Sequence, residues 1–134
     1  MPCSCEDAGG ILRADLSLSL QWQEHLETAI GVIMAGHKLN EAELQQAIAN
    51  LPGWVIREDK LHREYAFPSF TTAMAWMVAA GIEAEKMNHH PEWFNVYNRV
   101  RVDLVTHDLG QAISSLDVEL AQKMEQLAQP WLSA

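Results

Sequence analysis

Three of the six histidines stand where loops leave predicted helices or strands, and histidine is the side chain best suited to proton transfer near neutral pH. His89 and His90 are adjacent, between the end of a predicted helix and Pro91, and His107 follows a predicted strand. Folds commonly place reactive groups in such loops. The arrangement predicts a site for acid–base chemistry, although a single histidine in a loop is more often a surface or capping residue.

Other polar and aromatic residues near the histidines extend this hypothesis. Glu85 lies one helical turn before His89 and could orient a histidine or bind a polar ligand edge, while Trp93 offers a wall for a flat heterocycle. Three histidines can also hold catalytic zinc. No His-x-His or His-x-x-x-His spacing supports that alternative, and Cys3 with Cys5 would supply only half of a four-ligand zinc site. The sequence therefore favours chemistry without a metal.

The elements that must position these residues alternate regularly along the chain. Apolar periodicity and turn residues predict the order helix, two strands, helix, two strands, helix. The predicted helices begin near Asn40, Ser69 and Ser114 or Ser115, and the predicted strands cover about 54–56, 61–67, 94–97 and 100–106. Short hairpin connections favour antiparallel pairing. The sequence thus predicts an α+β fold, in which three helices pack on one face of a four-stranded antiparallel sheet.

The predicted helix over 70–87 is apolar nearly all round. One face, with residues at spacings of three and four, carries Phe70, Ala73, Met74, Met77, Ala80, Gly81 and Ala84. The other side carries Trp76, Val78, Ala79 and Ile82. A helix with this pattern requires burial on two sides. We expect a second copy of the chain to supply the second side, and the alternative is a central core helix with a few exposed apolar residues.

The first 36 residues differ from the rest, and the sequence divides into an extension over 1–36 and a domain over 37–134. Trp22, Leu26, Ile30 and Ile33 follow helical spacing, which predicts a short amphipathic helix over about 20–34. An alternative interpretation is that translation begins at Met34.

Composition narrows the function classes. The chain has 134 residues and a mass of 15.1 kDa, the size of one domain. A net charge of −9 argues against direct binding of nucleic acid or of an anionic membrane through charge. Two cysteines are compatible with a reducing compartment, and the first ten residues lack a basic signal-peptide region. The expected location is the cytoplasm.

One contiguous segment is specific enough to indicate a family. Residues 85–98, EKMNHHPEWFNVYN, resemble the pterin-4a-carbinolamine dehydratases. A second block, 106–108 with 116–117, and the segment 51–54, LPGW, also fit the family pattern. The resemblance runs from about Leu39 to Leu127. Asn88 departs from the pattern, because well-known animal members have an acidic residue there.

The resemblance implies a lyase, a 4a-hydroxytetrahydrobiopterin dehydratase (hydro-lyase) that needs no metal and no organic cofactor. It would dehydrate 4a-hydroxytetrahydropterin to quinonoid dihydropterin and so recycle tetrahydrobiopterin for aromatic amino acid hydroxylases, such as phenylalanine hydroxylase. The family's catalytic histidines fall on His89, His90 and His107. Its substrate-binding positions fall on Glu85, Asn88, Pro91, Trp93, Thr106, Asp108 and Asp117. We hypothesise that His89 and His107 transfer protons and that His90 holds the pterin.

The family also suggests partners. Its members form homodimers and homotetramers, here expected through the 70–87 helix and a sheet edge. Members of the wider superfamily serve as a transcription cofactor and as a Rubisco assembly factor. The alternative function is therefore a non-enzymatic protein-interaction module on the same fold.

Overall fold

The computed structural model describes residues 36–132. The helices are α2 (Glu41–Ala49), α3 (Phe70–Lys86) and α4 (Ser115–Leu132), with a short 3-10 helix, η1 (His107–Leu109). The strands are β1 (Val55–Arg57), β2 (Lys60–Ala66), β3 (Glu92–Val96) and β4 (Arg99–Leu104). The predicted order of elements is confirmed, and η1 was not predicted. The amphipathic helix predicted over 20–34 lies outside the described residues.

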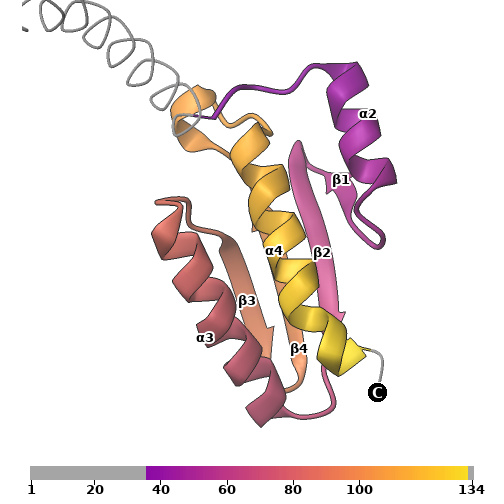
Figure 1. Cartoon of the computed structure of the whole chain (residues 1–134), viewed down its shortest axis with the longest axis vertical. Coiled ribbons are helices and arrows are strands. Elements are labelled where there is room, and N and C mark those ends of the chain that lie inside the picture. The colour runs from indigo at the N-terminus through magenta and orange to yellow at the C-terminus, as the bar shows by residue number, and fades with distance from the viewer. Residues whose placement is uncertain (1–35, 133–134) are drawn as a thin grey trace, which may run out of the picture. The chain divides into compact units, whose positions relative to one another are not determined.

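The four strands form one antiparallel sheet in the order β1-β2-β4-β3 (Figure 1). Glu58 and Asp59 connect β1 to β2, and both have positive φ angles, 51° and 61°, as the tightest hairpin turns require. β3 and β4 form the second hairpin, and the two hairpins join where β2 pairs with β4, with Tyr65 opposite Val100. The sheet is therefore two local hairpins joined by one long-range pairing.

Side-chain caps begin the first two helices as the sequence predicted. Asn40 and Glu43 form a reciprocal capping box, in which each side chain accepts a hydrogen bond from the other residue's backbone nitrogen. Ser69 Oγ accepts from the backbone nitrogen of Thr72 at 3.1 Å. These bonds satisfy N–H groups that have no partner within the helix, so they determine where α2 and α3 begin.

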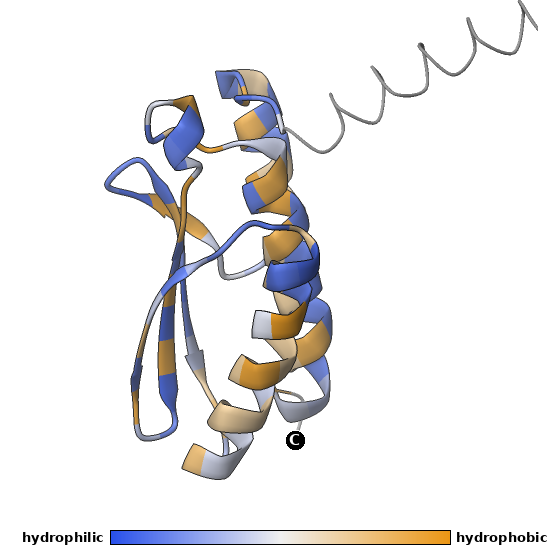
Figure 2. Ribbon diagram, turned by 90° about the vertical axis from the view of Figure 1, so that its left-hand side faces the viewer, coloured by the Kyte–Doolittle hydropathy of each residue, from blue (hydrophilic) through white to orange (hydrophobic). Residues whose placement is uncertain are grey.

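The core lies between the sheet and helices α3 and α4, which cover the same face of the sheet (Figure 2). Val100, Val102 and Leu104 are fully buried, as their alternation along the strand predicts. The helices contribute several small buried residues to the same core: Ala73, Ala80, Ala84, Ala121 and Ala128. Small side chains allow both helices to approach the sheet closely. None of the described helices is long and apolar enough to cross a membrane.

The buried face of α3 combines residues from both apolar sides of the predicted helix. Ala73, Ala80 and Ala84 of one side are buried together with Trp76 of the other, whereas Phe70 and Met74 are 47% and 39% exposed. The Trp76 ring lies 4.6 Å from the Tyr65 ring, centroid to centroid, and its Nε1 donates to the Met124 carbonyl at 3.2 Å. The sequence of a helix that is apolar nearly all round does not reveal which face is buried. The contacts of α3 with the sheet and α4 determine that face.

A buried carboxylate connects the first hairpin to α4. Glu125 Oε1 accepts hydrogen bonds from Trp54 Nε1 at 2.9 Å and from the Tyr65 hydroxyl at 2.7 Å. Arg63 Nε lies 3.1 Å from the same oxygen. Burial, followed by the hydrogen bond to Glu125, raises the pKa of Tyr65 far above its usual value. We call these four residues the Glu125 network, and it fixes α4 against the sheet.

Candidate active site

The site begins where α3 ends. Asn88 has a positive φ angle of 48°, a left-handed conformation that asparagine tolerates better than most residues. Its backbone nitrogen donates to the Glu85 carbonyl at 3.0 Å, and the backbone nitrogen of His89 donates to the Ala84 carbonyl at 3.0 Å. This turn ends the helix and separates two adjacent histidines. His89 is only 8% exposed, whereas His90 is exposed to solvent.

A fully buried carboxylate holds His89. His89 Nε2 lies 2.7 Å from Asp117 Oδ1, and Asp117 has no exposed surface. The second oxygen, Oδ2, accepts from Thr106 Oγ1 at 2.8 Å and from the backbone nitrogen of Ser114 at 2.7 Å. The Thr106 and Ser114 hydroxyls are 2.6 Å apart. We call these four residues the Asp117 cluster, in which both carboxylate oxygens have partners.

The start of α4 explains why Asp117 is there. Ser114 directly precedes the helix, and its Oγ accepts from the backbone nitrogen of Leu116 at 3.2 Å, as a helix cap does. Asp117 lies in the first helical turn, where backbone N–H groups and the helix dipole favour a negative charge. Thr106 follows β4 and is held by two backbone hydrogen bonds to Ala112. The helix cap at Ser114 and the end of β4 therefore position Asp117, the partner of His89.

The other two histidines also have a carboxylate beside Nε2. His90 Nε2 lies 2.8 Å from Glu85 Oε2, and His107 Nε2 lies 3.4 Å from Glu92 Oε1. Both pairs are largely exposed. A carboxylate next to one ring nitrogen favours the tautomer with its proton there, which leaves Nδ1 free to exchange a proton with a ligand.

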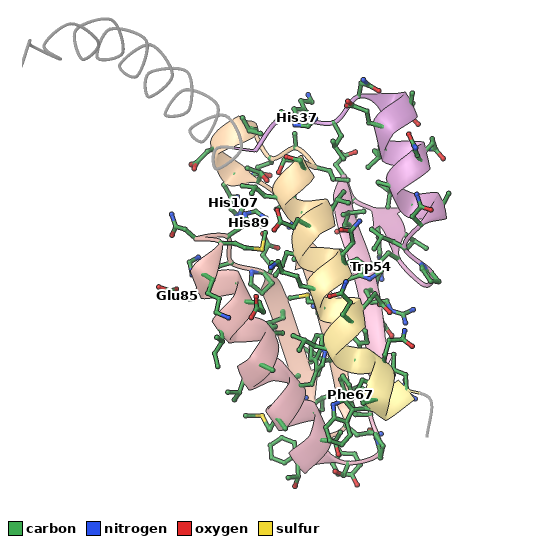
Figure 3. All side chains as sticks on the ribbon, in the orientation of Figure 1. His37, Trp54, Phe67, Glu85, His89 and His107 are labelled. Carbon is green, nitrogen blue, oxygen red and sulfur yellow. The ribbon has the colours of Figure 1, made fainter. Side chains whose placement is uncertain are left out.

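His89 and His107 lie side by side near the C-terminal end of α3, and Glu85 lies on α3 below them (Figure 3). Hydrogen bonds support this arrangement, because Thr106, the neighbour of His107, shares the Asp117 carboxylate with His89. The structure therefore brings together the two histidines that the sequence assigns to proton transfer.

The remaining predicted site residues differ in exposure. Thr106 is buried, Trp93 and Pro91 are half-buried, and Asp108 in η1 is exposed. The Trp93 ring packs against the core beside α3. Glu92 and Ser114 were not predicted as site residues. The sequence signal for Glu92 was its acidic side chain two residues after His90. That its partner is His107 becomes apparent only in the folded chain.

A cavity of about 420 Å³ lies elsewhere, between α2, β1 and the loop over 110–113. Its lining includes neither the three histidines nor any member of the Asp117 cluster. Within residues 36–132, no three His, Cys, Asp or Glu side chains are grouped as metal ligands. Cys3 and Cys5 lie outside the described residues.

The fold and the site define an α+β protein with carboxylate-paired histidines at one end of an antiparallel sheet. Residues 37–127 match the family described as pterin 4 alpha carbinolamine dehydratase. The chain belongs to this family. It is therefore an enzyme of the hydro-lyase class, and the family implies a pterin substrate.

Individual relatives agree with this assignment. A pterin-4-alpha-carbinolamine dehydratase of Solibacter usitatus is 50% identical over 91 residues, which are 68% of this chain and 95% of the relative. A protein of the same name from Jannaschia sp. is 51% identical over 96 residues, covering 69% and 97%. The crystal structure of a transcriptional coactivator/pterin dehydratase from Brucella melitensis has a TM-score of 0.66 and 40% identity, covering 69% of this chain and 99% of its own.

Proposed function

We propose that the chain dehydrates 4a-hydroxytetrahydropterin to quinonoid dihydropterin by histidine acid–base catalysis. The reaction would recycle the tetrahydropterin used by aromatic amino acid hydroxylases. The main supporting observation is the set of three histidines, each with a carboxylate beside Nε2. Membership of the dehydratase family supplies the substrate class.

The reaction requires two proton movements. The C4a hydroxyl must gain a proton to leave as water, and N5 must lose its proton so that the C4a–N5 double bond forms. An imidazolium can supply the first proton and a neutral imidazole can accept the second. We assign these roles to His89 and His107, acting through Nδ1, and assign His90 to holding the pterin.

The buried and exposed neighbours take supporting roles in this proposal. Asp117 has no exposed surface, so we propose that it acts through His89 as a positioning residue. Glu85 would act on the pterin or through His90, because its carboxylate is exposed beside that ring. The residues proposed to line or support the pterin site are Asn88, Pro91, Trp93, Thr106 and Asp108.

The first prediction concerns the proton-transfer pair. His89→Ala and His107→Ala should each lower kcat by about 10²-fold or more, because a positioned acid or base contributes about 10²–10⁴-fold. The measurement is the ultraviolet absorbance of freshly generated 4a-hydroxytetrahydropterin, with the spontaneous reaction as baseline. His37→Ala is the matched control, since His37 is exposed and its hydrogen bonds to Ser115 use backbone atoms. Near-normal turnover in both active-site variants would contradict the assignment.

We also infer that a second copy of the chain covers α3. Its solvent side carries an apolar stripe at every fourth residue, with Phe70, Met74, Val78 and Ile82 between 39% and 60% exposed. Such a stripe is typical of an interface between subunits. The β3 edge of the sheet offers a second contact for a dimer or tetramer.

The second prediction tests this association. Val78→Glu should shift the protein to a smaller species in sedimentation velocity, because it places a charge within the apolar stripe. Gln122→Glu adds the same charge at an exposed position of α4 and should leave the sedimentation coefficient unchanged. A monomeric wild-type protein, or equal behaviour of both variants, would argue against the interface.

The same stripe supports the alternative function, a protein-interaction module. The Brucella melitensis structure is described as a transcriptional coactivator as well as a pterin dehydratase. Folded wild-type protein that fails to accelerate the dehydration would favour this alternative. A partner that competes with self-association through the stripe would then be the next object of study.

A further inference from the structure

A chain of charges leads across the open face of the sheet to His107. Lys60 in β2 and Glu92 in β3 lie on opposite sides of β4, and Lys60 Nζ is 2.6 Å from Glu92 Oε2. The other oxygen of the same carboxylate, Oε1, is 3.4 Å from His107 Nε2. One carboxylate therefore connects a lysine of the first hairpin with a histidine of the proposed site.

The opposite charges of Lys60 and Glu92 favour this contact. The hydrogen bond to Glu92 is the largest cause that raises the pKa of Lys60 above its usual value. Lys60 thus remains a cation at neutral pH and holds one oxygen of Glu92. Asp103, the residue opposite Glu92 on β4, is held instead by His62 Nδ1 at 2.6 Å.

We propose that Glu92, held by Lys60, is the positioning residue of His107 in the dehydration proposed above, on which this inference rests. The carboxylate faces Nε2 of the ring, so it favours the tautomer and orientation in which Nδ1 is presented to the pterin. Lys60 holds Oε2 and so restricts the rotation of the Glu92 carboxylate, which keeps Oε1 directed toward His107.

A surface ion pair without function is the competing explanation. Exposed pairs contribute little to stability, and Glu92 and His107 are both exposed. The two explanations differ in what they predict for catalysis. If Glu92 positions His107, its loss lowers kcat, and only while His107 is present. If the two form a surface ion pair without function, the loss of Glu92 leaves kcat unchanged.

The third prediction therefore uses Glu92→Gln, which keeps the size of the side chain and removes its charge. We expect kcat to fall about tenfold, a part of the full contribution of a positioned acid or base, with KM changed less than about twofold. Lys60→Met should lower kcat about threefold, because Glu92 remains but is less restrained. Glu64→Gln is the matched control, since Glu64 lies on the same face beside His62.

Double variants separate positioning from general damage. In a His107→Ala background, Glu92→Gln should cause no further loss of kcat, because a residue that acts only through His107 has nothing left to position. An equal loss in both backgrounds would overturn the proposal. So would an unchanged kcat in Glu92→Gln when His107→Ala lowers it.

A spectroscopic measurement keeps this inference separate from the proposed function. The ¹⁵N signals of the His107 ring, observed by NMR in the full chain, should shift in Glu92→Gln and remain unchanged in Glu64→Gln. Wild-type protein without dehydratase activity would refute the proposed function, while unshifted His107 signals would refute the positioning role. The two failures are therefore distinguishable.

Discussion

Replacing Asp117 with alanine is expected to lower the free energy of unfolding by at least about 3 kcal/mol, because each of three buried groups loses its partner at a cost of about 1–3 kcal/mol. The affected groups are the Thr106 hydroxyl, the backbone N–H of Ser114 and the His89 ring, all of which are bonded to this carboxylate. The same change should lower kcat by at least about 10²-fold, since His89 loses the group that orients it. Urea denaturation and the dehydration assay measure the two effects.

Asp117→Asn separates catalysis from stability. Its amide oxygen can still accept from Thr106 and Ser114, but its NH₂ group would face His89 Nε2 and force the opposite tautomer. We therefore expect a smaller loss of stability than with alanine, together with a comparable loss of kcat. Glu119→Gln, an exposed change on the same helix, is the control. Full activity in a folded Asp117→Asn variant would refute the positioning role.

The second large effect is expected at Glu125. Glu125→Ala should lower the free energy of unfolding by about 3–5 kcal/mol, because removing one partner from a buried charged network leaves the others uncompensated. Trp54 Nε1, the Tyr65 hydroxyl and Arg63 would all lose the oxygen that they share. A loss of this size is a large fraction of the stability of a typical domain, about 5–15 kcal/mol. Equilibrium urea unfolding, followed by tryptophan fluorescence, measures it.

Controls for Glu125 should distinguish the network from simple loss of volume. Gln122→Ala removes a similar side chain from an exposed position of α4 and should cost little. Tyr65→Phe removes one donor and keeps the ring, so it should cost less than Glu125→Ala. Equal stability of Glu125→Ala and Gln122→Ala would show that the network contributes nothing.

Local signals in the sequence were sufficient to predict much of the fold. Asn40 and Ser69 are capping residues followed by apolar periodicity, and both begin helices as predicted. Val100, Val102 and Leu104 alternate with polar residues, and all three are buried. Each of these features depends on residues close in the sequence, which is why the pattern alone predicts them.

Features that depend on distant segments could not be predicted in the same way. The sequence did not show that Phe70 and Met74 would be exposed, because α3 is apolar on nearly every side and only its contacts determine which face is buried. The histidines at 89, 90 and 107 were identified from a contiguous segment and its second block. The pairing of His107 with Glu92 depends on where the strand end and η1 lie in space, and no local spacing encodes it.

The strand order β1-β2-β4-β3 also has a consequence for folding kinetics. Each hairpin closes a short turn, a step that takes about 1–10 μs in isolated hairpins. The central ladder joins residues as distant as Leu61 and Leu104, so it must first overcome the entropy of closing a loop of roughly 40 residues. Lys60 lies in the first hairpin, whereas Glu92 lies in the second and His107 follows it. A refolding intermediate that contains only the separate hairpins therefore lacks the contact between Lys60 and Glu92, and the regain of that contact during refolding follows formation of the central ladder.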